Sequence, residues 1–401
     1  MYQYLDAAVG RAAAWQPDQQ IGLWPDLTGH ATGPASWRAW LRQTAQIADF
    51  AVALEQASPV LAHRMYEICD GRQVPEAAVR RVVLSAMRYL LRASGRATPF
   101  GLFAGVAPAR IANLPVARVG TAHRAFAKVE SGWLISVIER LEAEPALRPR
   151  LMVLANNLVF ERDGYLVLEH RPSGSSGGAP THVRVRVTRP ISAVMNLARN
   201  PIRLGDLAAK LAADFARVPA DIVDTLLADL VAQRLLVTNL RPAMTASDPL
   251  GYLMGELQAV AAGQVAEVAS TVVDLREIAD GLRRHDSAST RAMAREHRAG
   301  LADAMADICP TAGPPLRVDL RMDWDLAVPR AVATEAAKAA GVLVRLAGAR
   351  VSAPAGSPGM AVSWNATARA PWSPSSTPSM PISGWGIRPA TSGLPRLRAV
   401  R

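Results

Sequence analysis

The sequence predicts a multidomain α+β protein with mixed sheets, helices and an embedded winged-helix-like module, and three observations predict it. Half of its 401 residues are hydrophobic, enough to bury the cores of two or three domains. A helix-period segment over 76–91 precedes an apolar, strand-like run over 102–106. Residues 151–237 hold three strand-like segments and then three helix-like ones, an order that indicates an α+β arrangement.

The segment 76–91 is predicted to be a helix with one buried face. Its apolar residues, among them Val79 and Val83, recur at intervals of three and four residues, the period of a helix face that packs on a core. Arg88 and Arg92 lie four residues apart and therefore form a basic stripe on another side of the same helix.

The turn after this helix is predicted to expose two polar side chains. Gly95 can end the helix, and a proline follows Thr98, which pushes that residue out of the α region. Arg96 and Thr98 are therefore expected in a loop. The run 102–106 then reads as a short buried strand, in which Gly105 allows another backbone to approach closely.

Residues 151–237 are predicted to form a separate unit. Strands are expected over 151–160, 165–170 and 182–187, and helices over 191–198, 204–215 and 220–234. Asp163-Gly164 marks a hairpin turn between the first two strands, and 173–178 is expected to be a flexible loop.

This order of elements resembles a small winged-helix module that binds a peptide leader as an added strand at a sheet edge. A DNA-binding winged helix is the alternative. The acidic residues Asp221, Asp224 and Asp229 of the last helix would repel phosphates, so a peptide is favoured over DNA.

The region 241–350 offers helices and one strand. A long helix is expected over 249–285, capped by Asp248, followed by a linker or further helix over 287–308. A strand over 316–320 and an Ala-rich helix over 329–346 complete it. The carboxylates of Asp319, Asp323 and Asp325 alternate in this region, but exposed strand carboxylates are commoner than metal ligands, and no metal is predicted.

Composition bounds the class of protein. The formal net charge is +11; residues 353–401 hold five arginines and no acidic residue, so residues 1–352 carry +11 − 5 = +6, which by itself supports nucleic-acid binding weakly. No run of eighteen apolar residues and no secretory signal is present, so a cytoplasmic protein without a membrane span is expected. Cys69 and Cys309 show no metal-type spacing, and no disulfide is predicted.

The string from Arg92 to Val106, RASGRATPFGLFAGV, resembles the signature of the lantibiotic dehydratase N-terminal region, the glutamylation domain of enzymes that modify ribosomal peptides. Segments 7–12, 130–134, 236–242 and 318–323 resemble further landmarks of this family. The resemblance covers residues 1 to about 350, only part of a typical member. The alternative is an ordinary solvated helix face next to a simple Pro-Phe-Gly turn.

The resemblance implies a transfer of glutamate from glutamyl-tRNA to Ser or Thr hydroxyls of a precursor peptide, with no other cofactor. The essential arginines of the family fall on Arg92 and Arg96, its threonine on Thr98, and its aspartate on Glu130, where a longer carboxylate stands. We expect these four to be catalytic. Three further residues are expected to bind the co-substrate: Arg11, Arg88 and Asp319.

Elementary chemistry makes these roles reasonable. Guanidinium groups bind phosphates and carboxylates through forked, charge-assisted hydrogen bonds. Arg96 or Thr98 could stabilise the oxyanion of acyl transfer, whereas Glu130 beside arginines would be a weak base and would rather position them. Its alternative role is that of a surface glutamate at a helix start.

The sequence predicts four regions: a first part of the glutamylation domain, the leader-recognition element, a continuation of the glutamylation domain, and a low-complexity tail. The tail is expected to be non-native or disordered, and a shift of the reading frame near Val351 would explain it. The bounds of the four regions are 1–150, 151–240, 241–350 and 351–401. A homodimer and a partner cyclase are compatible with this hypothesis. Two alternatives stay open: a related ligase that adds an aminoacyl group from tRNA to a peptide, and a module that only binds leader peptide or tRNA.

Overall fold

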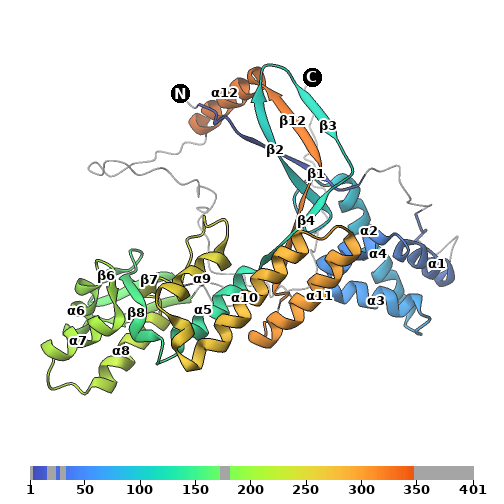
Figure 1. The fold of residues 1–401 in the computed structure, drawn as a ribbon. Coiled ribbons are helices and arrows are strands. Elements are labelled where there is room, and N and C mark those ends of the chain that lie inside the picture. Colours follow the sequence, from blue (N-terminus) through green and yellow to red (C-terminus); the bar gives the residue numbers. More distant parts are fainter. Residues whose placement is uncertain (1–2, 16–23, 28–32, 172–180, 312, 347–401) are drawn as a thin grey trace, which may run out of the picture. The chain divides into compact units, whose positions relative to one another are not determined.

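The computed structural model describes residues 3–15, 24–27, 33–171, 181–311 and 313–346. Within these residues the chain forms a mixed α+β fold with three sheets and twelve α-helices (Figure 1). Contacts divide the chain into the units 1–342 and 343–401. The expected loop over 173–178 and the expected tail over 351–401 lie outside the described residues.

Four helices near the N-terminus share one core. They are α1 (Pro34–Ala45), α2 (Ala48–Ala57), α3 (Pro59–Cys69) and α4 (Glu76–Gly95). In α4 the predicted apolar face is buried, including Val79 and Val83, and Gly95 is the last helical residue. The expected helix and its end are therefore confirmed, because the apolar spacing matches the face that the other three helices cover.

A six-stranded sheet collects strands from distant parts of the chain. They are β1 (Ala8–Ala13), β2 (Ala104–Ala112), β3 (Val116–Val119), β4 (Arg124–Val129), β11 (Leu316–Arg321) and β12 (Trp324–Pro329). Their order is β3-β12-β2-β11-β4, and β1 pairs with β2. Asp319 and Asp325 fall in different strands, with Asp323 in the break between β11 and β12, so the three carboxylates do not alternate along one strand as expected.

The predicted strand over 102–106 is correct in kind but begins at Ala104 and runs on to Ala112. Gly101 precedes it with a φ of 53°, a left-handed backbone that glycine adopts without strain. A Cβ atom on Gly105 would lie 2.5 Å from the carbonyl oxygen of Leu320 in β11. The expected close approach of backbones at Gly105 is thus confirmed.

A helical region packs around the largest core. It contains α5 (Ser131–Ala143), the 3₁₀ turns η1 (Arg148–Arg150) and η2 (Ala262–Gln264), α9 (Pro249–Ala259), α10 (Ala266–Asp286) and α11 (Arg291–Ile308). Asp248 caps α9 as expected, its side chain accepting a hydrogen bond from Gly251 N. The single helix expected over 249–285 is wrong, because Ala261 adopts a left-handed φ of 50° and interrupts it.

The region expected to be a separate unit lies within the unit 1–342. Its elements are β5 (Met152–Ala155), β6 (Phe160–Arg162), β7 (Tyr165–Arg171), β8 (Thr181–Arg186), α6 (Arg189–Leu197), β9 (Ile202–Arg203), α7 (Leu204–Asp214), α8 (Ala220–Ala232) and β10 (Leu236–Thr238). One core joins these helices to the strands. Asp163 and Gly164 have φ values of 54° and 74°, which confirms the expected hairpin turn. The first expected strand is split into β5 and β6, which belong to two different three-stranded sheets.

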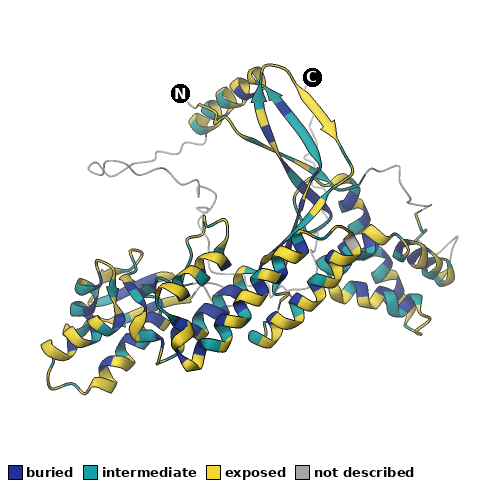
Figure 2. Cartoon of the chain, viewed as in Figure 1, coloured by how far each residue is buried: buried dark blue, intermediate teal, exposed yellow. Residues whose placement is uncertain are grey.

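Figure 2 shows how burial follows these elements: most helices carry one buried and one exposed face, whereas all four residues of β3 are exposed. The last helix is α12 (Arg330–Leu346), near the range expected for it. Within the described residues, no helix is both long enough and apolar enough to cross a membrane.

Candidate functional site

The C-terminal end of α4 presents the predicted arginines. Arg88 is exposed one turn before Arg92, which is half-buried, and Arg96 and Thr98 are exposed in the loop that follows. Arg96 caps the helix, its N–H donating to the carbonyl of Arg92 at 3.1 Å, and its own backbone is extended. The loop position expected for Arg96 and Thr98 is therefore confirmed.

Arg92 is held in place by its neighbours. Its Nη2 donates to the carbonyl oxygen of Thr98 at 3.5 Å, and its guanidinium lies 4.3 Å from the ring centroid of Phe100. Burial, and then the nearby positive charge of Arg96, lower the pKa of Arg92. The last turn of α4 and the loop after it thus bring two guanidinium groups into the same positive region.

Aromatic rings support this end of the helix. The Phe100 ring stacks on those of Tyr89 and Phe103, at centroid distances of 6.4 and 6.3 Å. Burial raises the pKa of Tyr89, so its hydroxyl stays neutral at physiological pH. The Pro-Phe-Gly turn thus presents Phe100 as a platform for Arg92, a contact that the sequence motif alone did not indicate.

Strand β1 brings Arg11 toward the same end of α4. Beyond β1, Trp15 N donates to the carbonyl of Ala93 at 3.1 Å, and Ala14 N donates to that of Phe103 at 2.9 Å. Arg11 is exposed and lies opposite Val106 of β2. The structure therefore joins the strand that carries Arg11 to both ends of the Arg92–Val106 motif.

Asp319 lies on the same sheet. Val106 pairs with Arg11 on one side and with Arg321 of β11 on the other, and Asp319 precedes Arg321 by two residues. Because side chains alternate along a strand, Arg11, Asp319 and Arg321 belong to one face. Asp319 Oδ1 accepts from Arg317 Nε at 3.3 Å. Arg321, which the sequence analysis did not single out, is a further cation of this face.

Glu130 is placed differently from the arginines. It caps α5, its side chain accepting a hydrogen bond from Gly132 N, and its own N–H donates to the carbonyl of Pro315 at 2.7 Å. It lies six residues beyond Arg124 along β4, and at about 3.3 Å per residue this is about 20 Å from the row of Arg11 and Arg321. A catalytic or positioning role for Glu130 stays a prediction.

A cavity of about 480 Å³ lies among α2, β4, α10 and α11. Leu320 of β11 and Arg124 and Ala125 of β4 are among the residues that line it. Arg298 and His285, both almost fully buried, line it as well, with Nη1 of Arg298 3.0 Å from Nε2 of His285. The sequence analysis missed this cavity, because the two residues stand on separate helices and form no motif.

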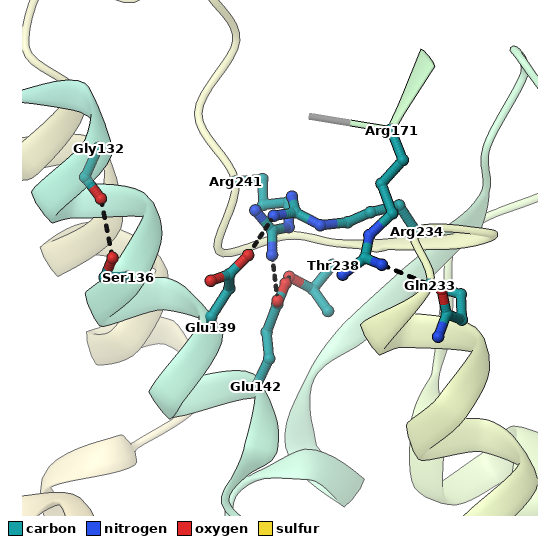
Figure 3. Close-up of polar contacts among 9 residues, drawn as sticks. All are labelled: Gly132, Ser136, Glu139, Glu142, Arg171, Gln233, Arg234, Thr238 and Arg241. Carbon is teal, nitrogen blue, oxygen red and sulfur yellow. Dashed lines mark hydrogen bonds and ion pairs between the residues drawn. The ribbon is translucent and has the colours of Figure 1, made fainter. Parts of the chain in front are cut away.

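A second group of buried charges joins α5 to the segment 233–241 (Figure 3). Glu142 accepts from the Thr238 hydroxyl at 2.5 Å and pairs with Arg241, both side chains being almost fully buried. Glu139 pairs with Arg234 at 2.7 Å. Burial lowers the pKa of Arg241 and the adjacent Glu142 opposes this shift, so the pair is matched within the chain.

Comparison with known proteins places this arrangement in a family. Residues 46–357 match the family described as Lantibiotic dehydratase, N terminus. The chain is 27% identical over 175 residues to the subtilin biosynthesis protein SpaB of Bacillus subtilis, an alignment that covers 43% of this chain and 16% of SpaB. It is 21% identical over 181 residues to the epidermin biosynthesis protein EpiB of Staphylococcus epidermidis, covering 44% and 18% of the two chains.

Among solved structures, the fold is similar to that of the tRNA-dependent lantibiotic dehydratase MibB from Microbispora sp. 107891. The TM-score is 0.69 and the sequence identity 30%, over 86% of this chain and 31% of MibB. The chain thus spans less than a third of the MibB chain and less than a fifth of SpaB and EpiB.

Proposed function

The chain belongs to the lantibiotic dehydratase N-terminal family, and from this premise we propose that it carries part of a glutamylation domain. Such a domain transfers glutamate from glutamyl-tRNA to Ser or Thr hydroxyls of a ribosomal precursor peptide. The observation that carries the proposal is the pair of guanidinium groups of Arg92 and Arg96 at the exposed end of α4, next to the strand of Arg11.

In this proposal the arginines bind the glutamyl-tRNA. The Phe100 ring and the Thr98 carbonyl already orient the Arg92 side chain. Binding of glutamyl-tRNA therefore loses less side-chain entropy than it would with a flexible arginine. Arg96 and Thr98, both exposed, would donate to the ester oxygen as it becomes an oxyanion, and Arg88, Arg11 and Asp319 would contact the tRNA or the glutamyl group.

The leader of the precursor peptide would bind at β8. This strand is an edge of the sheet β6-β7-β8, and four of its six residues are exposed. A peptide added to that edge gains backbone hydrogen bonds, with Arg184 held over the Tyr165 ring at 4.5 Å beside it. Asp221, Asp224 and Asp229 are exposed on α8, which supports a peptide ligand over DNA.

The test is an assay of transfer. The full chain is incubated with glutamyl-tRNA that carries labelled glutamate and with a peptide rich in Ser and Thr, and label in the peptide is measured together with its position. Label on Ser or Thr side chains supports the proposal. Label at the peptide C-terminus supports the related ligase, and binding of tRNA or leader without any transfer supports a pure binding module.

A further inference from the structure

The cavity between α10 and α11 is lined by a buried cation, Arg298, whose side-chain hydrogen bond goes to a histidine and not to a carboxylate. The Arg298 residue is 7% exposed. Its side-chain hydrogen bond goes to His285, and none of the carboxylates that the structure describes forms an ion pair with it. Burying a guanidinium without an anion is costly, so such a residue indicates a ligand that brings one.

The hydrogen bonds fix the state of His285. A guanidinium only donates, so Nε2 of His285 accepts from Arg298 and carries no proton. Nδ1 therefore carries the proton and donates to Asp286 Oδ1 at 2.8 Å. Burial lowers the pKa of His285, which agrees with a neutral ring. The neutral imidazole orients Arg298 but brings no negative charge to it.

Burial lowers the pKa of Arg298 and the charge of Glu55 opposes this shift, but this carboxylate is already engaged in other hydrogen bonds. Glu55 of α2 forms two hydrogen bonds with Arg295, at 2.8 and 2.7 Å, and accepts a third from the Tyr66 hydroxyl at 2.9 Å. Burial, and then Glu55, raise the pKa of Tyr66 to about 12, so that hydroxyl keeps its proton. Glu55 thus pairs directly with Arg295, whereas Arg298 lines the cavity without an ion pair to Glu55.

The other walls select the kind of anion. Trp15, Leu102 and Leu320 form an apolar side, whereas Ser287, Ser289 and Thr290 contribute hydroxyls from the loop between the two helices. Asp49 and Asp286 also line the cavity; they would repel a phosphate dianion but tolerate a molecule that carries an ammonium group as well as a carboxylate. The volume of about 480 Å³ suits a small molecule.

We propose that this cavity binds a small carboxylate of amino-acid size, with Arg298 as the partner of the carboxylate. The proposed function supplies the identity of the amino acid, glutamate, either free or as the glutamyl group of the tRNA. The described residues that line this cavity include none of Arg88, Arg92, Arg96 and Thr98, so it is not the site at the end of α4.

The experiment measures binding by calorimetry on the full chain, with L-glutamate, glutarate, L-glutamine and inorganic phosphate as probes. We expect L-glutamate to bind and L-glutamine, which lacks the side-chain charge, to bind about tenfold more weakly or less. Arg298→Gln should weaken L-glutamate binding by about tenfold or more, whereas Arg276→Gln, which removes an exposed charge from α10, should not.

A second variant guards against misfolding of Arg298→Gln. Ser289 is exposed and lines the cavity, so Ser289→Trp fills it without removing a buried charge and should also block L-glutamate. Competition by glutamyl-tRNA but not by uncharged tRNA identifies the glutamyl group as the ligand; competition by neither identifies free glutamate. Stronger binding of phosphate, equal binding of L-glutamine, or no binding of either L-glutamate or glutarate by the folded chain would overturn the proposal.

The transfer assay separates this proposal from the proposed function. A chain that binds L-glutamate through Arg298 but transfers no label to any peptide contradicts the proposed function and leaves the cavity assignment intact. If the chain binds no L-glutamate and the Arg298→Gln variant transfers label as well as the parent, the cavity assignment is contradicted and the proposed function stands.

Discussion

Arginines stand in two contrasting settings, at the exposed end of α4 and in the buried contact between α5 and the segment 233–241. Arg241 is mostly buried and is matched inside the chain by Glu142 (Figure 3). Arg92 lies in the last turn of α4 and Arg96 directly follows the helix; burial, and then the positive charge of Arg96, lower the pKa of Arg92. The difference teaches that an arginine matched in the interior holds the fold, whereas arginines at an exposed helix end are placed where a ligand can reach them.

The largest expected effect is a loss of stability when the buried pair of Arg241 and Glu142 is broken. Arg241→Met leaves Glu142 buried without its ion pair, and we expect a loss of about 3–5 kcal/mol in the free energy of unfolding. Urea unfolding followed by circular dichroism measures it. Arg283→Met, which breaks the exposed pair with Asp280, is the matched control and should cost about 0–1 kcal/mol. Equal losses in both variants would erase the distinction.

Replacing the arginines at the exposed end of α4 should lower the transfer activity and leave the free energy of unfolding unchanged. Replacing Arg92 and Arg96 together by alanine is expected to reduce transfer of labelled glutamate by about a hundredfold, since the groups that bind the anion are lost. Arg81→Ala, also exposed on α4, is the control and should leave transfer unchanged. Unchanged transfer by the double variant would mean that the motif has no part in the reaction.

The contrast between these regions reflects what sequence patterns contain. Helix α4, its end at Gly95 and the exposed loop after it could be predicted, because the spacing of apolar residues, the glycine and the proline all act on the local backbone. The pairing of β1 with β2 and the position of Arg321 beside Val106 could not be predicted, since they depend on contacts across about one hundred and more than two hundred residues, respectively. The break at Ala261 was missed because alanine carries no signal for a left-handed backbone.

The candidate site divides in the same way. Arg92, Arg96 and Thr98 were found because one continuous string carries them, whereas Glu130 was assigned from a family landmark and lies at the start of α5. Arg298 and His285 are thirteen residues apart on two helices, and an isolated arginine in a sequence does not reveal that it will be buried without a carboxylate.

A smaller effect concerns the sheet that carries Arg11 and Asp319. Gly105→Ala would place a Cβ atom against the backbone of Leu320, so β2 and β11 must move apart, at a cost of about 1–3 kcal/mol in the free energy of unfolding. Thermal unfolding measures this loss. Gly255→Ala, at an exposed position of α9 with open space around it, should instead stabilise the chain by about 1 kcal/mol. A Gly105→Ala chain as stable as the parent would contradict this packing.

The smallest expected effect is a pH dependence from His285. Burial, Arg298 and His297 lower its pKa, and Asp286 opposes them, so the unfolded chain binds the proton more readily than the folded one. Stability should therefore fall as the pH drops below the ordinary value of about 6.5 toward the lowered pKa. Urea midpoints between about pH 7.5 and about pH 5 should decrease more for the parent than for His285→Gln. Identical pH slopes would place the titration elsewhere.

The six-stranded sheet has a consequence for how the protein is made. Its central strand β2 has β1 on one side and β11 and β12 on the other, and these two partners are separated by some three hundred residues. During synthesis, β2 must therefore wait with one edge open until Pro329 has left the ribosome, and such late pairings are slow. Chaperone demand should thus peak during translation of the stretch between these strands.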